Sequence, residues 1–86
     1  MAKYKITIRK SAAKELEGIS GKDLRRIVKR IQNLADNPRP PGCEKLSARR
    51  CYRIRQGDYR IIYSIDDDDR IVDIFKIGHR REIYRL

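Results

Sequence analysis

The spacing of the apolar residues changes from a helical period to a strand period near the middle of the chain, and this change constrains the fold most. Between Leu24 and Ala35, apolar residues recur every three or four positions, which predicts one α-helix over residues 22–36. From residue 51 onward, apolar and polar residues alternate instead, which is typical of half-buried strands. The predicted strands are 51–56, 59–65 and 70–77.

The rest of the chain adds one strand, one short helix and a long connection. Residues 3–9 alternate charged and apolar side chains and predict a first strand. A short helix is expected over 12–18, with Ser11 as its N-terminal cap. The segment 37–48 is rich in Pro and Gly, so we expect an irregular connection there.

Two predicted turns join the last three strands into an antiparallel meander. Gly57-Asp58 is typical of a tight hairpin turn, and Asp66 to Asp69 form a second, solvated turn. Gly78 is expected to end the last strand before a short C-terminal tail or helical turn. The order strand-helix-helix-strand-strand-strand predicts a single α+β domain over residues 1–86, with two helices on a mainly antiparallel sheet. In this two-layer domain the other sheet face stays open.

The charge of the chain indicates a polyanionic partner. The 22 Lys and Arg residues outnumber the 12 Asp and Glu residues, for a formal net charge of +10. RNA, DNA or an acidic protein would each match such a surface. No apolar run approaches the roughly 20 residues of a membrane span, so we expect a cytoplasmic protein with no membrane partner.

Neither a metal site nor a cofactor is expected. The chain has one His and two Cys residues, and Cys43 and Cys51 are too far apart in sequence for a CxxC pair, so we expect reduced thiols. The acidic residues form no convincing catalytic cluster. Glu44, in the predicted connection, is a weak candidate for a general base.

Strand alternation gathers arginines on the open face of the sheet. Tyr52 and Ile54 point one way, and Arg53 and Arg55 point the other, together with Arg60 of the next strand. Either these arginines are simply solvated, or they bind phosphates, because the guanidinium fork matches paired phosphate oxygens.

The C-terminal tail adds His79, Arg80, Arg81 and Tyr84, which we expect beside the arginine face. Tyr84 could stack on a base, transfer a proton or serve only as a packed anchor. His79 is the one side chain whose ordinary pKa lies near neutrality, although a purely structural, hydrogen-bonded histidine is equally compatible with the sequence.

Three segments resemble the RelE/ParE superfamily of bacterial and archaeal toxins: LADNPRPPGCEKL at 34–46, YRIRQGDYRIIYSI at 52–65 and IGHRREIYR at 77–85. The resemblance spans nearly the whole chain and is strongest to the RelE branch. Members of that branch are ribosome-dependent mRNA interferases, which are held silent by a cognate antitoxin. The resemblance therefore implies an acidic, RelB-like antitoxin in a hetero-oligomeric complex, with the ribosome and mRNA as further partners.

The same resemblance implies site residues and a metal-independent mechanism. The 2′-hydroxyl of the RNA would attack the adjacent phosphorus and leave a 2′,3′-cyclic phosphate and a 5′-hydroxyl. Arg60 and Arg80 would stabilise the charge that develops, and Tyr84 and His79 would transfer protons. The residues implied for binding RNA phosphates are Arg53, Arg55 and Arg81.

Two other functions remain compatible with the sequence. A toxin of the ParE branch would share the fold and poison DNA gyrase without cutting RNA, although such toxins generally lack the arginine and tyrosine set. A basic nucleic-acid-binding module would grip phosphates without any chemistry, and its affinity would fall steeply with salt.

Overall fold

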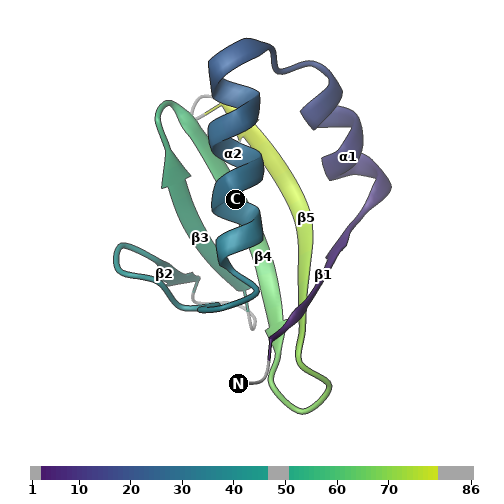
Figure 1. Ribbon diagram of the computed structural model, residues 1–86, viewed down its shortest axis with the longest axis vertical. Coiled ribbons are helices and arrows are strands. Elements are labelled where there is room, and N and C mark those ends of the chain that lie inside the picture. Colours follow the sequence, from purple (N-terminus) through teal and green to yellow (C-terminus); the bar gives the residue numbers. More distant parts are fainter. Residues whose placement is uncertain (1–2, 47–50, 80–86) are drawn as a thin grey trace.

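Two helices lie on one face of a five-stranded sheet. The computed structural model describes residues 3–46 and 51–79. The elements in chain order are β1 (Lys5–Ile8), α1 (Lys10–Glu17), α2 (Gly21–Asn33), β2 (Glu44–Leu46), β3 (Cys51–Gln56), β4 (Tyr59–Asp66) and β5 (Ile71–His79). The strand order is β1-β5-β4-β3-β2, with α2 across the centre of the sheet and α1 beside β5 and β1 (Figure 1). The predicted two-layer α+β fold is confirmed.

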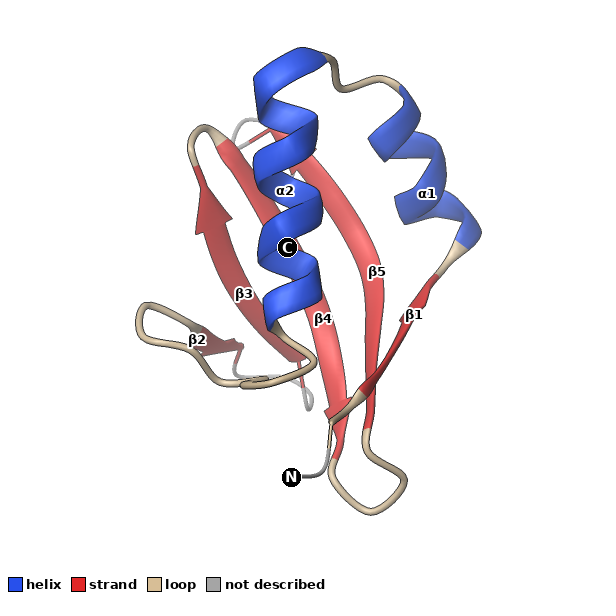
Figure 2. Ribbon diagram, viewed as in Figure 1, coloured by secondary structure: helices blue, strands red, loops and turns tan. Residues whose placement is uncertain are grey.

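The sheet is antiparallel except at one edge. The hairpins β3–β4 and β4–β5 form the predicted meander, with Ile54 opposite Ile61 and Ile61 opposite Ile77. The first strand instead runs parallel to the last one, with Ile6 opposite Val72. The two helices therefore connect β1, at one edge of the sheet, to β2, at the opposite edge (Figure 2).

The core lies between the helices and the inner face of the sheet. Helix α2 buries Ile27 and Ile31 fully or almost fully, and Leu34 continues the same stripe just beyond the helix. Full burial of one such side chain contributes about 1.5–3 kcal/mol. Val28 belongs to the predicted stripe but is 36% exposed, so the buried side of α2 is narrower than the sequence pattern. The sheet residues of the core are Ile54, Ile61, Tyr63, Ile65, Val72, Ile74 and Ile77.

Two details of the N-terminal half differ from the sequence prediction. Strand β2 lies inside the segment expected to be an irregular connection, and it pairs with β3 so that Glu44 faces Arg53. The N-cap of α1 is Arg9, not Ser11. Ser11 lies within the first turn, and its hydroxyl donates instead to the backbone oxygen of Phe75, 3.3 Å away. A serine in the first turn of a helix can form a hydrogen bond with the backbone of a neighbouring strand in place of a capping bond to its own helix.

Strand β5 also differs from the prediction at both ends. Arg70 adopts a left-handed conformation with φ of 56°, so the strand begins at Ile71. Gly78 does not end the strand, which continues to His79. Between these ends a β-bulge interrupts the register, because Ile62 pairs with Lys76 but Tyr63 pairs with Ile74. The bulge inserts Phe75 as an extra residue and resets the alternation of β5.

No helix within residues 3–46 and 51–79 is both long enough and apolar enough to cross a membrane.

Candidate nucleic-acid interface

Arginines of β3 and β4 meet on the sheet face that the helices leave uncovered. Arg55 lies directly opposite Arg60 across the β3–β4 hairpin, and Arg53 lies opposite Ile62. Directly opposite residues share a face and bring their Cβ atoms within about 5 Å of each other. The predicted grouping of Arg53, Arg55 and Arg60 on one face is therefore confirmed. We call these residues the arginine face.

One carboxylate partly balances this positive charge. A guanidinium nitrogen of Arg53 donates to Glu44 Oε2 at 2.8 Å. This hydrogen bond, the charge of Arg53, and then the charges of Arg55 and Arg60 hold the pKa of Glu44 below its usual range. A carboxylate with a lowered pKa is a weaker base, so the geometry assigns Glu44 the role of a counter-ion rather than a general base.

Strand β5 contributes a further cation that the sequence analysis missed. Lys76 lies opposite Ile62, and Gly78 lies opposite Arg60, so both continue the rows of the arginine face. Simple alternation from Ile74 would have placed Lys76 among the buried residues, and only the bulge reverses it. The one available signal was the break in alternation at Ile74-Phe75. Ile62 forms a buried apolar floor among these cations, with 1% of its surface exposed.

His79 lies on the opposite side of the sheet from the arginine face. It pairs with Tyr59, and their rings meet edge to face with centroids 5.7 Å apart. Because β5 continues past Gly78, alternation turns His79 towards the layer that contains the helices. The sequence predicts His79 beside the arginines only if the strand ends one residue earlier. The structure therefore does not bring His79 together with Arg60.

Three of the predicted site residues, Arg80, Arg81 and Tyr84, lie outside the described residues. Their roles stay predictions.

A second charged cluster fixes the segment that leads into β2. Arg39 binds Asp67 through two hydrogen bonds of 2.8 and 3.2 Å, and its guanidinium lies 5.2 Å from the centre of the Tyr52 ring. Tyr63, buried in the core, donates to the backbone oxygen of Pro38 at 2.6 Å. These contacts hold residues 38 and 39 against the sheet, which positions β2 and therefore Glu44. The turn at Asp66 to Asp69, expected to be merely solvated, thus has a structural role.

The three arginines of the arginine face can bind phosphates and stabilise negative charge, but their guanidinium groups cannot accept a proton. Guanidinium groups stay protonated at any physiological pH. Within the two described stretches, no cluster of three or more His, Cys, Asp or Glu side chains could hold a metal ion. The described part of the site is therefore an electrostatic surface that fits a polyanion.

Known proteins share both this sequence and this fold. The sequence model of the ParE toxin of the type II toxin–antitoxin system parDE matches residues 6–84. A RelE1-named protein of Methanocaldococcus jannaschii is 33% identical, over 96% of this chain and 97% of its own. Toxin RelE of Mycobacterium tuberculosis is 31% identical, over 96% and 88% of the two chains.

Solved structures agree with the sequence matches. The archaeal RelE–RelB complex from Pyrococcus horikoshii contains a chain that is 31% identical, with a TM-score of 0.82 over 91% of this chain and 96% of that one. The toxin–antitoxin complex RelBE2 from Mycobacterium tuberculosis gives 25% identity and a TM-score of 0.79, over 91% and 99%. The chain therefore belongs to the RelE/ParE superfamily and is a toxin of a type II toxin–antitoxin system.

Proposed function

We propose that this toxin is a ribosome-dependent endoribonuclease that cleaves messenger RNA in the ribosomal A site. The observation that carries the proposal is the direct opposition of Arg55 and Arg60, with Arg53 on the same face. Three like charges on two adjacent strands repel one another, and among the described contacts Glu44 binds Arg53. A phosphate backbone would bring negative charge to this face and accept bidentate hydrogen bonds from the guanidinium groups.

In the proposed reaction the RNA supplies its own nucleophile. The 2′-oxygen bonds to the adjacent phosphorus, and the bond from that phosphorus to the 5′-oxygen breaks. A base takes the proton from the 2′-hydroxyl, and an acid gives a proton to the departing 5′-oxygen. Arg60 and Arg80 stabilise the charge on the phosphorane, while Arg53, Arg55 and Arg81 hold the neighbouring phosphates.

In this proposal, a side chain of the C-terminal tail transfers the protons. His79 faces away from the arginine face, so we assign proton transfer to Tyr84 in preference to His79. A phenolic hydroxyl can both donate and accept a proton. Because the described arginines cannot transfer protons, such a site needs precise positioning of its substrate. The ribosome would provide that positioning, and orientation alone can contribute about 7–11 kcal/mol to a barrier.

The proposed partner is an antitoxin of RelB type, and the proposed location is the cytoplasm, where translating ribosomes are. The similar structures include complexes of a RelE toxin with RelB. The net charge of +10 suits an acidic chain that folds on binding. Such a partner would silence the toxin by covering the arginine face or by displacing the tail.

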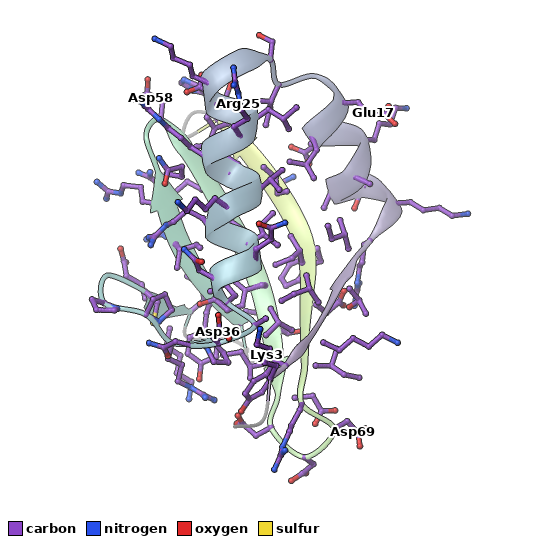
Figure 3. All side chains as sticks on the ribbon, viewed as in Figure 1. Lys3, Glu17, Arg25, Asp36, Asp58 and Asp69 are labelled. Carbon is purple, nitrogen blue, oxygen red and sulfur yellow. The ribbon has the colours of Figure 1, made fainter. Side chains whose placement is uncertain are left out.

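The test adds the purified toxin to a reconstituted translation system and maps message ends by primer extension. Wild-type protein is expected to cut within A-site codons, and Arg60→Ala is expected to lower the rate about 100-fold or more. Arg25→Ala is the matched control, because it removes the same charge from the exposed side of α2 (Figure 3). Messages that stay intact with folded wild-type toxin would contradict the proposal.

A second candidate function is inhibition of DNA gyrase, which the match to the ParE family model favours. The two functions differ in a direct assay with purified gyrase and supercoiled plasmid. Trapped gyrase–DNA complexes alongside intact message would support the gyrase function. Retention of labelled RNA without cleavage would instead indicate a non-catalytic binding module.

A further inference from the structure

A pocket of about 380 Å³ lies between the C-terminal end of α1 and the end of β5, on the opposite side of the sheet from the arginine face. Pockets that take small organic molecules begin at about 300 Å³. Its lining on the helix side comes from Glu15, Gly18 and Ile19, and on the sheet side from Tyr59, Ile77 and His79.

The chemistry of the lining suits a flat heterocycle. Ile19 and Ile77 are buried and provide an apolar floor. Tyr59 and His79 present two rings at 81° to each other, so an incoming ring can stack on one and meet the edge of the other. Glu15 adds a carboxylate, which accepts hydrogen bonds and donates none at neutral pH. An occupant with N–H donors on its edge would therefore form hydrogen bonds to the Glu15 carboxylate.

The pocket lies next to the arginine face in spite of being on the other side of the sheet. Tyr59 directly precedes Arg60 in β4, and Gly78, which also lines the pocket, lies opposite Arg60. Strand β1 pairs only with residues 71–74, so the stretch of β5 beside the pocket extends beyond β1. The turn at Gly57 and Asp58 is exposed and directly precedes Tyr59 and Arg60, so a bound strand of RNA could pass around this end of the sheet from Arg60 into the pocket.

We infer that this pocket holds one nucleobase of the bound RNA and so contributes to sequence preference. The inference rests on the proposed function, because it takes RNA as the substrate of the arginine face. Guanine is the best match, since its Watson–Crick edge presents two adjacent N–H donors to a carboxylate. The other bases present at most one such donor group beside an acceptor, which Glu15 would repel. An apolar or basic side chain of a partner protein is the competing occupant.

The single histidine of the chain makes a direct binding test possible, because only His79 gives an imidazole signal in the proton NMR spectrum. The protein is titrated with 5′-GMP and, separately, with 5′-UMP. Both nucleotides carry the same phosphate, so contacts to the arginines cancel in the comparison. The His79 signal is expected to saturate at a concentration of 5′-GMP that is about fivefold lower than that of 5′-UMP, the low end for a bidentate contact to a base.

Glu15→Gln is expected to abolish this difference between the two nucleotides. Glu17→Gln is the matched control, because it removes the same charge from the exposed side of the same helix (Figure 3). Equal responses to both nucleotides in the wild type, or a His79 signal that moves only with the antitoxin, would overturn the inference. This titration needs no cleavage, so intact message in the translation assay would refute the proposed function separately.

Discussion

The buried hydroxyl of Tyr63 gives the sharpest test of how the fold holds the segment before β2. Tyr63 has no exposed surface, and its hydroxyl donates to the oxygen of Pro38 at 2.6 Å. Tyr63→Phe removes the donor and leaves that oxygen, in a buried proline, without this partner. Leaving a buried polar group unsatisfied costs about 1–3 kcal/mol. For a domain of this size each kcal/mol lowers the melting temperature by about 4–8 °C.

Tyr52→Phe is the matched control for this substitution. The Tyr52 ring stacks on that of Tyr63 with centroids 5.9 Å apart, but its hydroxyl contacts Arg39 on the exposed side of the cluster. Its removal is expected to cost less than about 0.5 kcal/mol. The free energy of unfolding is measured by urea denaturation at pH 7, with an unchanged slope as the sign that the fold is intact. Equal losses for the two variants would refute the reasoning.

The same tyrosine predicts how stability changes in alkaline solution. Burial raises the pKa of Tyr63 above its ordinary value of 10.0. Above pH 10 the unfolded chain therefore loses a proton that the folded protein keeps, and the contribution of Tyr63 to stability is lost as the pH rises. The decline is at most about 1.4 kcal/mol per pH unit for one group. Tyr63→Phe is expected to decline less steeply above pH 10, and identical pH profiles would contradict this cause.

Three further substitutions test the charged clusters. Asp67→Asn breaks the ion pair with Arg39. Because both groups are substantially exposed, we expect the free energy of unfolding to fall by only about 0–1 kcal/mol. Urea unfolding at low and high salt is expected to show that this loss is smaller in high salt. If Arg55 contacts one phosphate, Arg55→Ala is expected to reduce the salt dependence of binding to single-stranded RNA. Filter binding would measure this as a decrease of about 0.7 in the magnitude of the slope of log affinity against log salt concentration. Glu44→Gln removes the counter-ion of Arg53 and is expected to tighten RNA binding at low salt. The variant is also expected to cleave messages in the translation system. Loss of cleavage by a folded variant would indicate instead that Glu44 is a general base.

Regular patterns in the sequence predicted most of the fold. The helical spacing from Leu24 to Ala35 and the alternation after residue 51 predicted α2 and the β3–β4–β5 meander, because both patterns follow directly from burial of one side of an element. The same alternation predicted the arginine face. These features need no knowledge of distant contacts.

The features that sequence reasoning missed all depend on contacts between distant segments. Strand β2 has three residues and exists because β3 offers it a partner. The bulge at Phe75 and the continuation of β5 to His79 depend on pairing with β4. One extra or one missing residue in a strand reverses the side on which every later residue lies. This reversal explains why Lys76 was overlooked and why His79 was expected on the other face.

The parallel pairing of β1 with β5 also determines when the sheet can be completed during synthesis. Thr7 of β1 binds the carboxylate of Asp73 in β5 at 3.0 Å, across a separation of 66 residues in the sequence. Contacts of such long range form late in folding, because closing a long loop costs entropy before it gains contacts. During synthesis, β1 therefore stays unpaired until β5 has left the ribosome. The parallel edge of the sheet would thus form only after β5 has been synthesised, and the nascent chain would stay incompletely folded until then.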